Sequence, residues 1–197
     1  MKSESIVFAV AGMFFGVLLG WIIATQQAAP VVPQPAPAAP AAAQNQAPPL
    51  DEGRVQALKA VIDSDPKNAS AHAQLGNVYF DAQRWADAIN WYEKALQLNP
   101  NDPDISTDLG VSYYYTNRAD DALAQFEKSL KINPNHTKTL LNKGIVLAFG
   151  KEDLGAAAEE WKKVVALAPD TPEGQAARRA LEGVAAAHAQ QNTTTNQ

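Results

Sequence analysis

The chain of 197 residues contains no cysteine, which excludes disulfide bonds, thiolate catalysis and zinc sites built on cysteine. Basic residues are also few: the chain has 16 Lys and Arg and 21 Asp and Glu, which gives a formal net charge of −5. Affinity for nucleic acid comes from cations that neutralise phosphates, so this balance argues against DNA or RNA as a partner. Residues 5–50 contain no charged side chain at all.

Signs of catalysis are missing as well. The three histidines are far apart along the chain, and no H-E-x-x-H motif, nucleophile elbow or phosphate-binding loop is present. We interpret His72 as structural and the adjacent acids Asp120–Asp121 and Glu159–Glu160 as charge on solvated helix faces. The sequence therefore predicts no enzyme active site, no metal site and no cofactor.

One long apolar run is present, at residues 6–25 (IVFAVAGMFFGVLLGWIIAT). A helix needs about 20 such residues to cross a bilayer, so we predict a single transmembrane helix here. A cleaved signal peptide is the alternative, but its apolar core usually has about 7–15 residues and an A-x-A site should follow. Lys2 precedes the run and no charge follows it nearby, which favours a cytoplasmic N-terminus and an exported remainder.

Within this run, Gly12, Gly16 and Gly20 recur every fourth residue and share one helix face. Faces of small residues allow two membrane helices to approach closely, so this pattern predicts a homodimer formed through the anchor. The alternative is that glycine is simply common in membrane helices.

Residues 26–50 are rich in Pro and Ala and uncharged, which is typical of an extended linker rather than a packed domain. The linker also contains the P-x-x-P spacing of a peptide ligand, although no basic residue flanks it. At the other end of the chain, residues 190–197 are polar and predict a disordered tail.

A nearly identical phrase recurs four times, and its prolines Pro66, Pro100, Pro134 and Pro169 are spaced by 34, 34 and 35 residues. Between them, apolar residues recur at helical spacing in two stretches per unit. Proline cannot continue a helix, so we expect each of these prolines to end the second helix of a unit. A fixed period of this length predicts stacked helix pairs.

Glycine occurs at the same position of the first two units, as Gly76 and Gly110. Two helices approach closely only where one surface lacks bulk. We therefore expect these glycines to face the small residues Ala95 and Ser129, or their neighbours, in the second helix of each unit.

These units resemble tetratricopeptide repeats in the order of their small and aromatic residues. The positions that carry the resemblance are Leu75-Gly76, Tyr79, Ala88, Tyr92, Ala95 and Pro100 in the first unit, and Leu109-Gly110, Tyr113, Ala122, Phe126, Ser129 and Pro134 in the second. The resemblance implies an all-α solenoid over residues 51–189. It comprises a half-repeat, repeats at 69–102, 103–136 and 137–171, and a capping helix at 172–189. The third repeat fits with one residue inserted near GKEDLG.

The resemblance also implies a concave groove, lined by the first helices, that binds an extended peptide of a protein partner. The groove residues it implies are Asn77, Phe80, Asp81, Asp108, Val111, Tyr114, Tyr115, Leu141, Asn142, Ile145 and Phe149. The alternative is that Phe80, Tyr114 and Phe149 only pack between repeats. Ala73 replaces a lysine of repeats that bind chaperone tails, which argues against that ligand.

Anchor, linker and repeats together resemble bacterial envelope proteins with these repeats, including assembly factors for c-type cytochromes. This architecture predicts a scaffold that positions a protein partner on the exported, periplasmic side of a bacterial inner membrane. Two alternatives stay open. One is a structural protein that assembles with itself through the glycine face, and the other is a secreted soluble repeat protein.

Overall fold

The computed structural model describes residues 47–195. Within this range the chain forms eight α-helices and no β-strand. The helices are α2 (Glu52–Ser64), α3 (Ala69–Asp81), α4 (Trp85–Leu98), α5 (Pro103–Tyr115), α6 (Ala119–Ile132), α7 (Thr137–Gly150), α8 (Leu154–Leu167) and α9 (Pro172–Thr195). The predicted membrane helix at 6–25, its glycine face and the linker up to residue 46 lie outside the described residues. Among the described helices, none has both the length and the apolar character needed to span a membrane.

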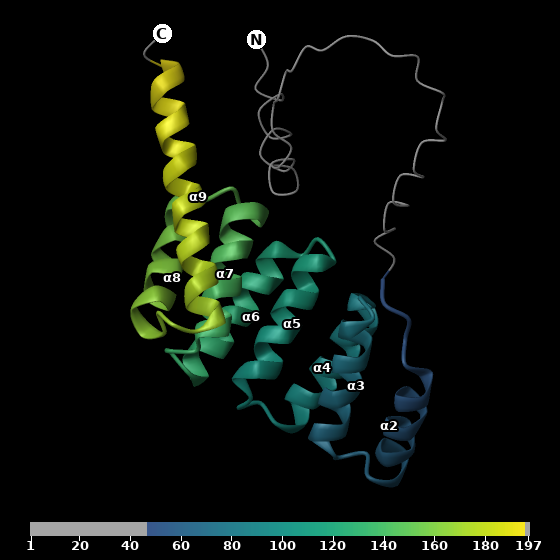
Figure 1. The fold of residues 1–197 in the computed structure, drawn as a ribbon. Helices are drawn as coiled ribbons and strands as arrows, with labels where there is room; N and C mark the ends of the chain where they lie inside the picture. The colour runs from purple at the N-terminus through teal and green to yellow at the C-terminus, as the bar shows by residue number, and fades with distance from the viewer. Residues whose placement is uncertain (1–46, 196–197) are drawn as a thin grey trace, which may run out of the picture. The chain divides into compact units, whose positions relative to one another are not determined.

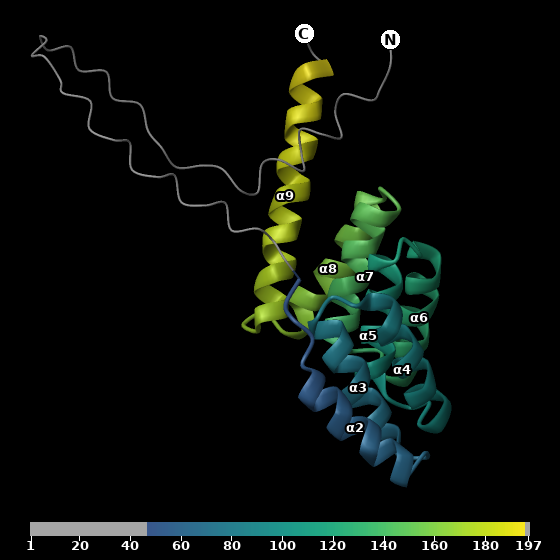
Figure 2. The same cartoon turned by 90° about the vertical axis from the view of Figure 1, so that its right-hand side faces the viewer.

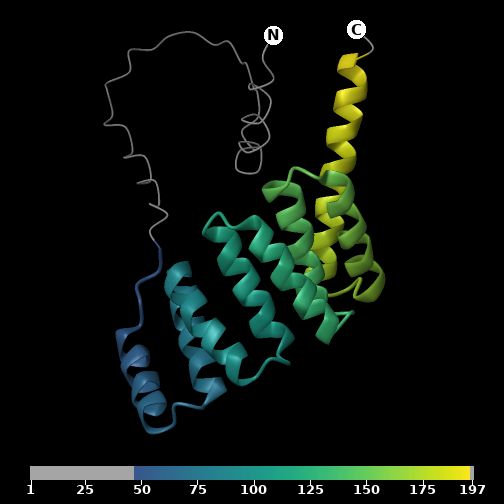
Figure 3. The same cartoon turned by 180° about the vertical axis from the view of Figure 1, so that it is seen from behind.

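The helices pack as successive pairs in chain order (Figures 1 and 3). The pairs are α3 with α4, α5 with α6 and α7 with α8, and each pair contacts the next through α4 and α5 or α6 and α7. Helix α2 covers the first pair and α9 packs against the last, so both ends of the stack are closed. The predicted all-α solenoid of helix pairs is confirmed for the described residues.

Helix boundaries follow local signals in the sequence. The second helices end at Ser64, Leu98, Ile132 and Leu167, each two residues before one of the four recurring prolines. At the other end, the Asp102 carboxylate accepts a hydrogen bond from the Ile105 amide at 3.0 Å, and Pro103 takes the first helical position. Asp51, Asn68 and Asp153 cap α2, α3 and α8 in the same way.

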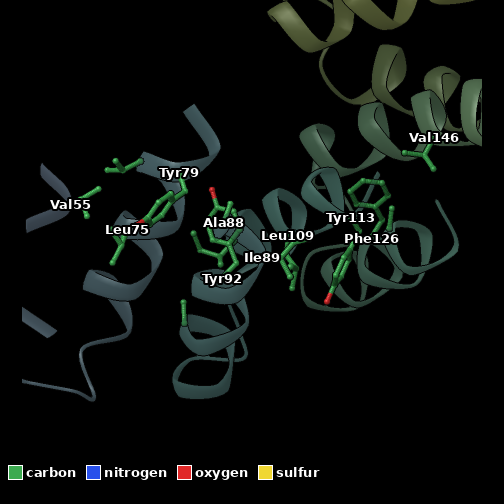
Figure 4. Close-up of a cluster of buried hydrophobic side chains, with 14 residues drawn as sticks. Val55, Leu75, Tyr79, Ala88, Ile89, Tyr92, Leu109, Tyr113, Phe126 and Val146 are labelled. Carbon is green, nitrogen blue, oxygen red and sulfur yellow. The ribbon is translucent and has the colours of Figure 1, made fainter. Parts of the chain in front are cut away.

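The core runs along the stack in two clusters. Figure 4 shows its buried side chains following one another from Val55 in α2 to Val146 in α7, with Tyr92 and Phe126 between them. A second cluster, centred on Trp161, continues the core through α7, α8 and α9. Each helix pair therefore buries apolar surface against its neighbours, as expected of a repeat stack.

The glycines have aromatic partners, so the expectation that they face Ala95 and Ser129 is wrong. A Cβ atom added to Gly76 would lie 2.5 Å from Cδ1 of Tyr92, and one added to Gly110 would lie 2.5 Å from Cε1 of Phe126. The physical reason is that a bulky ring needs a surface without a side chain, and the glycine provides it. Gly144 meets the Trp161 ring in the same way, so all three repeats share one register.

The third repeat carries its extra residue in its first helix, which confirms the predicted insertion. Helix α7 has 14 residues, whereas α3 and α5 have 13. The turns that follow these three helices each contain one residue with positive φ: Gln83 at 56°, Asn117 at 61° and Glu152 at 56°. The same left-handed turn therefore closes each first helix despite the insertion.

The last helix is longer than the sequence predicts. Helix α9 continues to Thr195, past the predicted end at residue 189, so residues 190–195 are helical rather than disordered. Alanine at 185–187 and 189 has the highest intrinsic helix propensity, which favours continuation of a helix that has already formed. Figures 1 and 2 show this end of α9 projecting past the other helices.

One of the acids assigned to solvated faces is buried. The Glu160 side chain is only 9% exposed and accepts hydrogen bonds from Lys143 at 2.8 Å and Lys163 at 2.9 Å. Burial alone would raise the pKa of the Glu160 carboxyl, but the two lysines outweigh it and hold the pKa below its ordinary value. The surface interpretation is therefore wrong for Glu160, because Lys143 reaches it from the neighbouring helix.

Candidate peptide-binding groove

A polar hollow of about 410 Å³ lies among the first helices. It is lined by Arg54 of α2, Asn77, Phe80 and Asp81 of α3, Tyr92 of α4, Asp108 and Val111 of α5, and Lys138 and Asn142 of α7. Six of the eleven predicted groove residues are therefore brought together here: Asn77, Phe80, Asp81, Asp108, Val111 and Asn142.

Asn77, which lines the hollow, is held by a hydrogen bond. The Tyr92 hydroxyl donates a hydrogen bond of 2.8 Å to the Asn77 Oδ1 atom. Burial and the carboxylates of Asp108 and Asp81 raise the pKa of Tyr92, so its hydroxyl keeps the proton that it donates. The bond uses the amide oxygen of Asn77, and the amide NH₂ group keeps its donors for a ligand.

An ion pair joins the second and third repeats at this hollow. The Lys138 ammonium lies 2.8 Å from an Asp108 carboxylate oxygen, and the Asp108 side chain is only 15% exposed. Burial raises the pKa of Asp108, and Lys138 opposes that effect. Asn142 donates a hydrogen bond to the Lys138 carbonyl oxygen at 2.8 Å, which holds its amide beside the pair.

A second hollow, of about 290 Å³, adjoins the first at Asn77. Its lining comes from the first repeat and the start of the second: Ala69, Ser70, Ala73, Gln74, Asn77, Ala95, Asn99, Asp102 and Ile105. We call the two hollows together the polar groove. It offers amide, hydroxyl and carboxylate groups across neighbouring helices, and the small Ala73 keeps it open.

Three of the four predicted aromatic residues lie at a different place. Tyr114, Tyr115 and Phe149 line a separate hollow of about 410 Å³ at the ends of α5 and α7, with Asn117, Ala119 and Gly150. Trp85 stacks on Tyr115, with ring centroids 4.4 Å apart and an angle of 13° between the rings. We call Trp85, Tyr114, Tyr115 and Phe149 the aromatic edge.

The last two predicted residues, Leu141 and Ile145, are partly buried against the second core cluster. The Leu141 carbonyl oxygen accepts a hydrogen bond from the Trp161 indole at 3.2 Å. These two residues therefore pack between helices. Packing of this kind was the alternative given above for Phe80, Tyr114 and Phe149.

Sequence reasoning missed three residues of the first hollow. Lys138 occupies the second position of the third repeat, which the repeat pattern assigns to the groove, so its position was a usable signal. Tyr92 was named only as a position of the repeat pattern. Its ring fills the space beside Gly76, and Tyr92 also lines the groove. Arg54 comes from the half-repeat, for which the repeat pattern defines no groove position.

Comparison with known families identifies the repeats. A family model described as TPR repeat matches residues 76–117, and one described as tetratricopeptide repeat matches residues 103–136. Residues 76–136 therefore match tetratricopeptide repeats. A comparison with curated protein sequences gives no match.

Solved structures with the same fold include a crystal structure of MamA, which is 17% identical with a TM-score of 0.59. That match covers 72% of this chain and 91% of the MamA chain. The first TPR domain of Spaghetti (RPAP3), bound to the HSP90 peptide SRMEEVD, is 24% identical with a TM-score of 0.56, over 64% of this chain and 96% of its own. The first TPR domain of human RPAP3 is 23% identical with a TM-score of 0.57, over 65% and 98%. At these identities the likeness shows the fold alone.

Proposed function

We propose that this chain is a scaffold that binds an extended peptide segment of a partner protein in the polar groove. The observation that carries the proposal is the arrangement of the two adjoining hollows, which line up donors and acceptors from α2, α3, α5 and α7. A related fold supports it, because the first TPR domain of Spaghetti (RPAP3) is seen bound to a peptide.

An extended peptide fits this arrangement better than a compact ligand. Neighbouring packed helices lie about 8–10 Å apart, and an extended chain rises about 3.3 Å per residue. An extended peptide can therefore run past several helices of the groove, with alternate side chains directed toward them. Asn77 and Asn142 are the amides in position to bind the peptide backbone, because both are held by hydrogen bonds to neighbouring residues.

The groove favours binding over catalysis. Carboxylates in the groove lie together with cations. Asp108 pairs with Lys138, and Asp81 lines the same hollow as Arg54. Among the described residues, no group of three or more His, Asp or Glu side chains is placed to hold a metal ion. We therefore assign the groove to recognition of a protein partner.

The experiment is site-specific photo-crosslinking in the full chain. A photoreactive residue at Val111 lines the polar groove, and the matched control is Lys131, which is exposed on α6. We expect a heterologous protein to crosslink at Val111, and the Asn77→Ala, Asn142→Ala double variant to reduce that crosslink. Equal crosslinking at both positions would contradict the proposal, and crosslinking to itself alone would favour the self-assembling alternative.

We also propose that residues 6–25 anchor the scaffold as a single membrane-spanning helix, with residues 26–50 as its linker and the repeats on the exported side of a bacterial inner membrane. The support is the length and apolar character of the run and the charge placed before it. In this location the scaffold would serve the assembly of an envelope complex. Alkaline extraction of membranes tests the anchor, and recovery of the intact chain in the soluble fraction would contradict it.

Pairing of two anchors through Gly12, Gly16 and Gly20 stays a proposal as well. We expect Gly16→Ile to weaken self-association in a membrane two-hybrid assay, because the larger side chain separates the helix backbones. Unchanged association would refute the dimer.

A further inference from the structure

The aromatic edge is a surface that the polar groove does not explain. Its rings stay in contact with solvent, with Tyr115 56% exposed and Phe149 65% exposed. Apolar side chains gathered on a surface are typical of interaction sites, whereas single exposed ones need no explanation. Here two exposed rings line one hollow, which indicates an interaction site.

Three of the four rings, those of Trp85, Tyr114 and Tyr115, contact other aromatic rings without a ligand. Trp85 stacks on Tyr115 at 4.4 Å, and the Phe80 ring meets Trp85 edge-on, with centroids 4.8 Å apart and an angle of 82°. The Tyr114 ring lies 5.7 Å from Tyr115. A surface that is already ordered loses little conformational entropy on binding, which favours recognition.

The hollow has aromatic walls and no bulky residue fills it. Its other lining residues include Ala119 and Gly150, which are small. A Cβ atom added to Gly150 would lie 3.2 Å from both the Tyr114 ring and the Ala119 Cβ atom, so the glycine keeps this space free. The slot is suited to a flat apolar group that can stack against the rings.

The surroundings favour an uncharged ligand. None of the residues lining the hollow is charged. The three cations near it are each paired with a carboxylate: Arg84 with Asp87 at 2.7 Å, Arg118 with Asp121 at 2.7 Å and Lys151 with Asp120 at 2.8 Å. A charged peptide would have to compete with these pairs for a partner.

We propose that the aromatic edge is a second docking surface, which binds an uncharged, proline-rich segment of a partner protein in the polyproline II conformation. Proline rings stack on aromatic side chains, and the polyproline II backbone makes no internal hydrogen bonds, so its carbonyl groups are available. Asn117 and the tyrosine hydroxyls supply donors at the same hollow. This hollow shares no lining residue with the polar groove, so this proposal does not rest on the proposed function.

The test is binding of a fluorescein-labelled probe to the full chain in detergent, measured by fluorescence anisotropy. The probe is a blocked dodecapeptide of Pro-Ala-Pro repeats, and a proline-free Ala-Ser peptide of the same length is the comparison probe. The linker of the chain itself contains five prolines within residues 30–40 and could compete with the probe. All protein variants therefore carry serine in place of these five prolines.

We expect the Pro-Ala-Pro probe to bind and the Ala-Ser probe not to bind. The Tyr115→Ala, Phe149→Ala double variant should weaken binding about tenfold or more, because both exposed rings are lost. The matched control is Leu98→Ala, Leu167→Ala, which removes two exposed apolar side chains elsewhere and should leave the affinity unchanged. Circular dichroism checks that all variants are folded.

Three results would overturn the proposal: no binding of the Pro-Ala-Pro probe, equal binding of both probes, or equal affinity of the two double variants. Because Asn77 and Asn142 lie in the polar groove, their alanine variants should bind this probe as tightly as the parent chain. Loss of crosslinking at Val111 and loss of probe binding at the aromatic edge are therefore separate outcomes.

Discussion

A single added methyl group tests the contact that sets the repeat register. In Gly110→Ala the new Cβ atom would lie 2.5 Å from Cε1 and 2.7 Å from Cδ1 of Phe126. Carbon atoms in favourable contact are about 3.5–4.0 Å apart, so the overlap is about 1 Å or more. The Phe126 ring is fully buried and cannot move aside into solvent. Overpacking of this kind costs about 1–3 kcal/mol.

Gly183→Ala is the matched control. Gly183 also lies in a helix, but nothing stands within 4 Å of the position that its Cβ atom would take. Both substitutions gain the helix propensity of alanine over glycine, about 1 kcal/mol, so this gain cancels when the two variants are compared. We expect Gly183→Ala to be more stable than Gly110→Ala by about 1–3 kcal/mol, the cost of the overlap alone.

Thermal unfolding followed by far-ultraviolet circular dichroism measures this difference, which we expect to be roughly 3–10 °C in Tm. Phe126→Leu removes the outer ring atoms that the new Cβ atom would meet. The Gly110→Ala, Phe126→Leu double variant should therefore lose less stability than the two single variants lose in total. Equal melting temperatures for Gly110→Ala and Gly183→Ala would refute the close approach of ring and glycine.

Three further predictions concern other parts of the stack. Lys143→Met leaves the buried Glu160 with one lysine and should destabilise the fold by about 2–4 kcal/mol in urea unfolding, whereas Lys162→Met, which breaks an exposed pair, should cost less than about 1 kcal/mol. The lowered pKa of Glu160 contributes stability that is fully present above its ordinary value of 4.5 and is lost as the pH falls through the folded pKa. Tm of Glu160→Gln should therefore depend less on pH in that acidic range, and an unchanged pH profile would count against the buried ion pairs. Asp102→Ala removes the cap of α5 and should cost about 1 kcal/mol, and a larger loss would point to a further role for this carboxylate.

Signals that act over a few residues made much of the fold predictable. Asp102 caps the residues directly after it, and Pro134 stops the helix directly before it, so neither depends on the rest of the structure. The constant spacing of such signals was enough to place the helix pairs. The inserted residue of the third repeat was predictable as well. Gly144 before it and Trp161 after it both match positions of the repeat pattern.

Contacts between helices were less predictable. Which residue fills the space beside Gly110 depends on the rotation of two helices about their axes, and the choice between Phe126 and Ser129 is a difference of less than one helical turn. Glu160 looked exposed because its own helix gives no sign of Lys143, which lies 17 residues earlier.

The candidate site was predictable in composition but not in arrangement. The repeat pattern selects residues near the concave side, and six of them do line the polar groove. It could not show that Tyr115 turns to Trp85, since that stacking joins the second repeat to the start of α4. The pattern therefore combined two surfaces of different chemistry into one groove.

Hydrogen exchange of the full chain with and without its partner segment tests the central claim most directly. The segment would be the peptide that crosslinks at Val111, supplied in synthetic form. We expect added protection in α3, α5 and α7, which line the polar groove, and little change in α6 and α8. Protection confined to α6 and α8, or none in any helix, would contradict peptide binding in the polar groove.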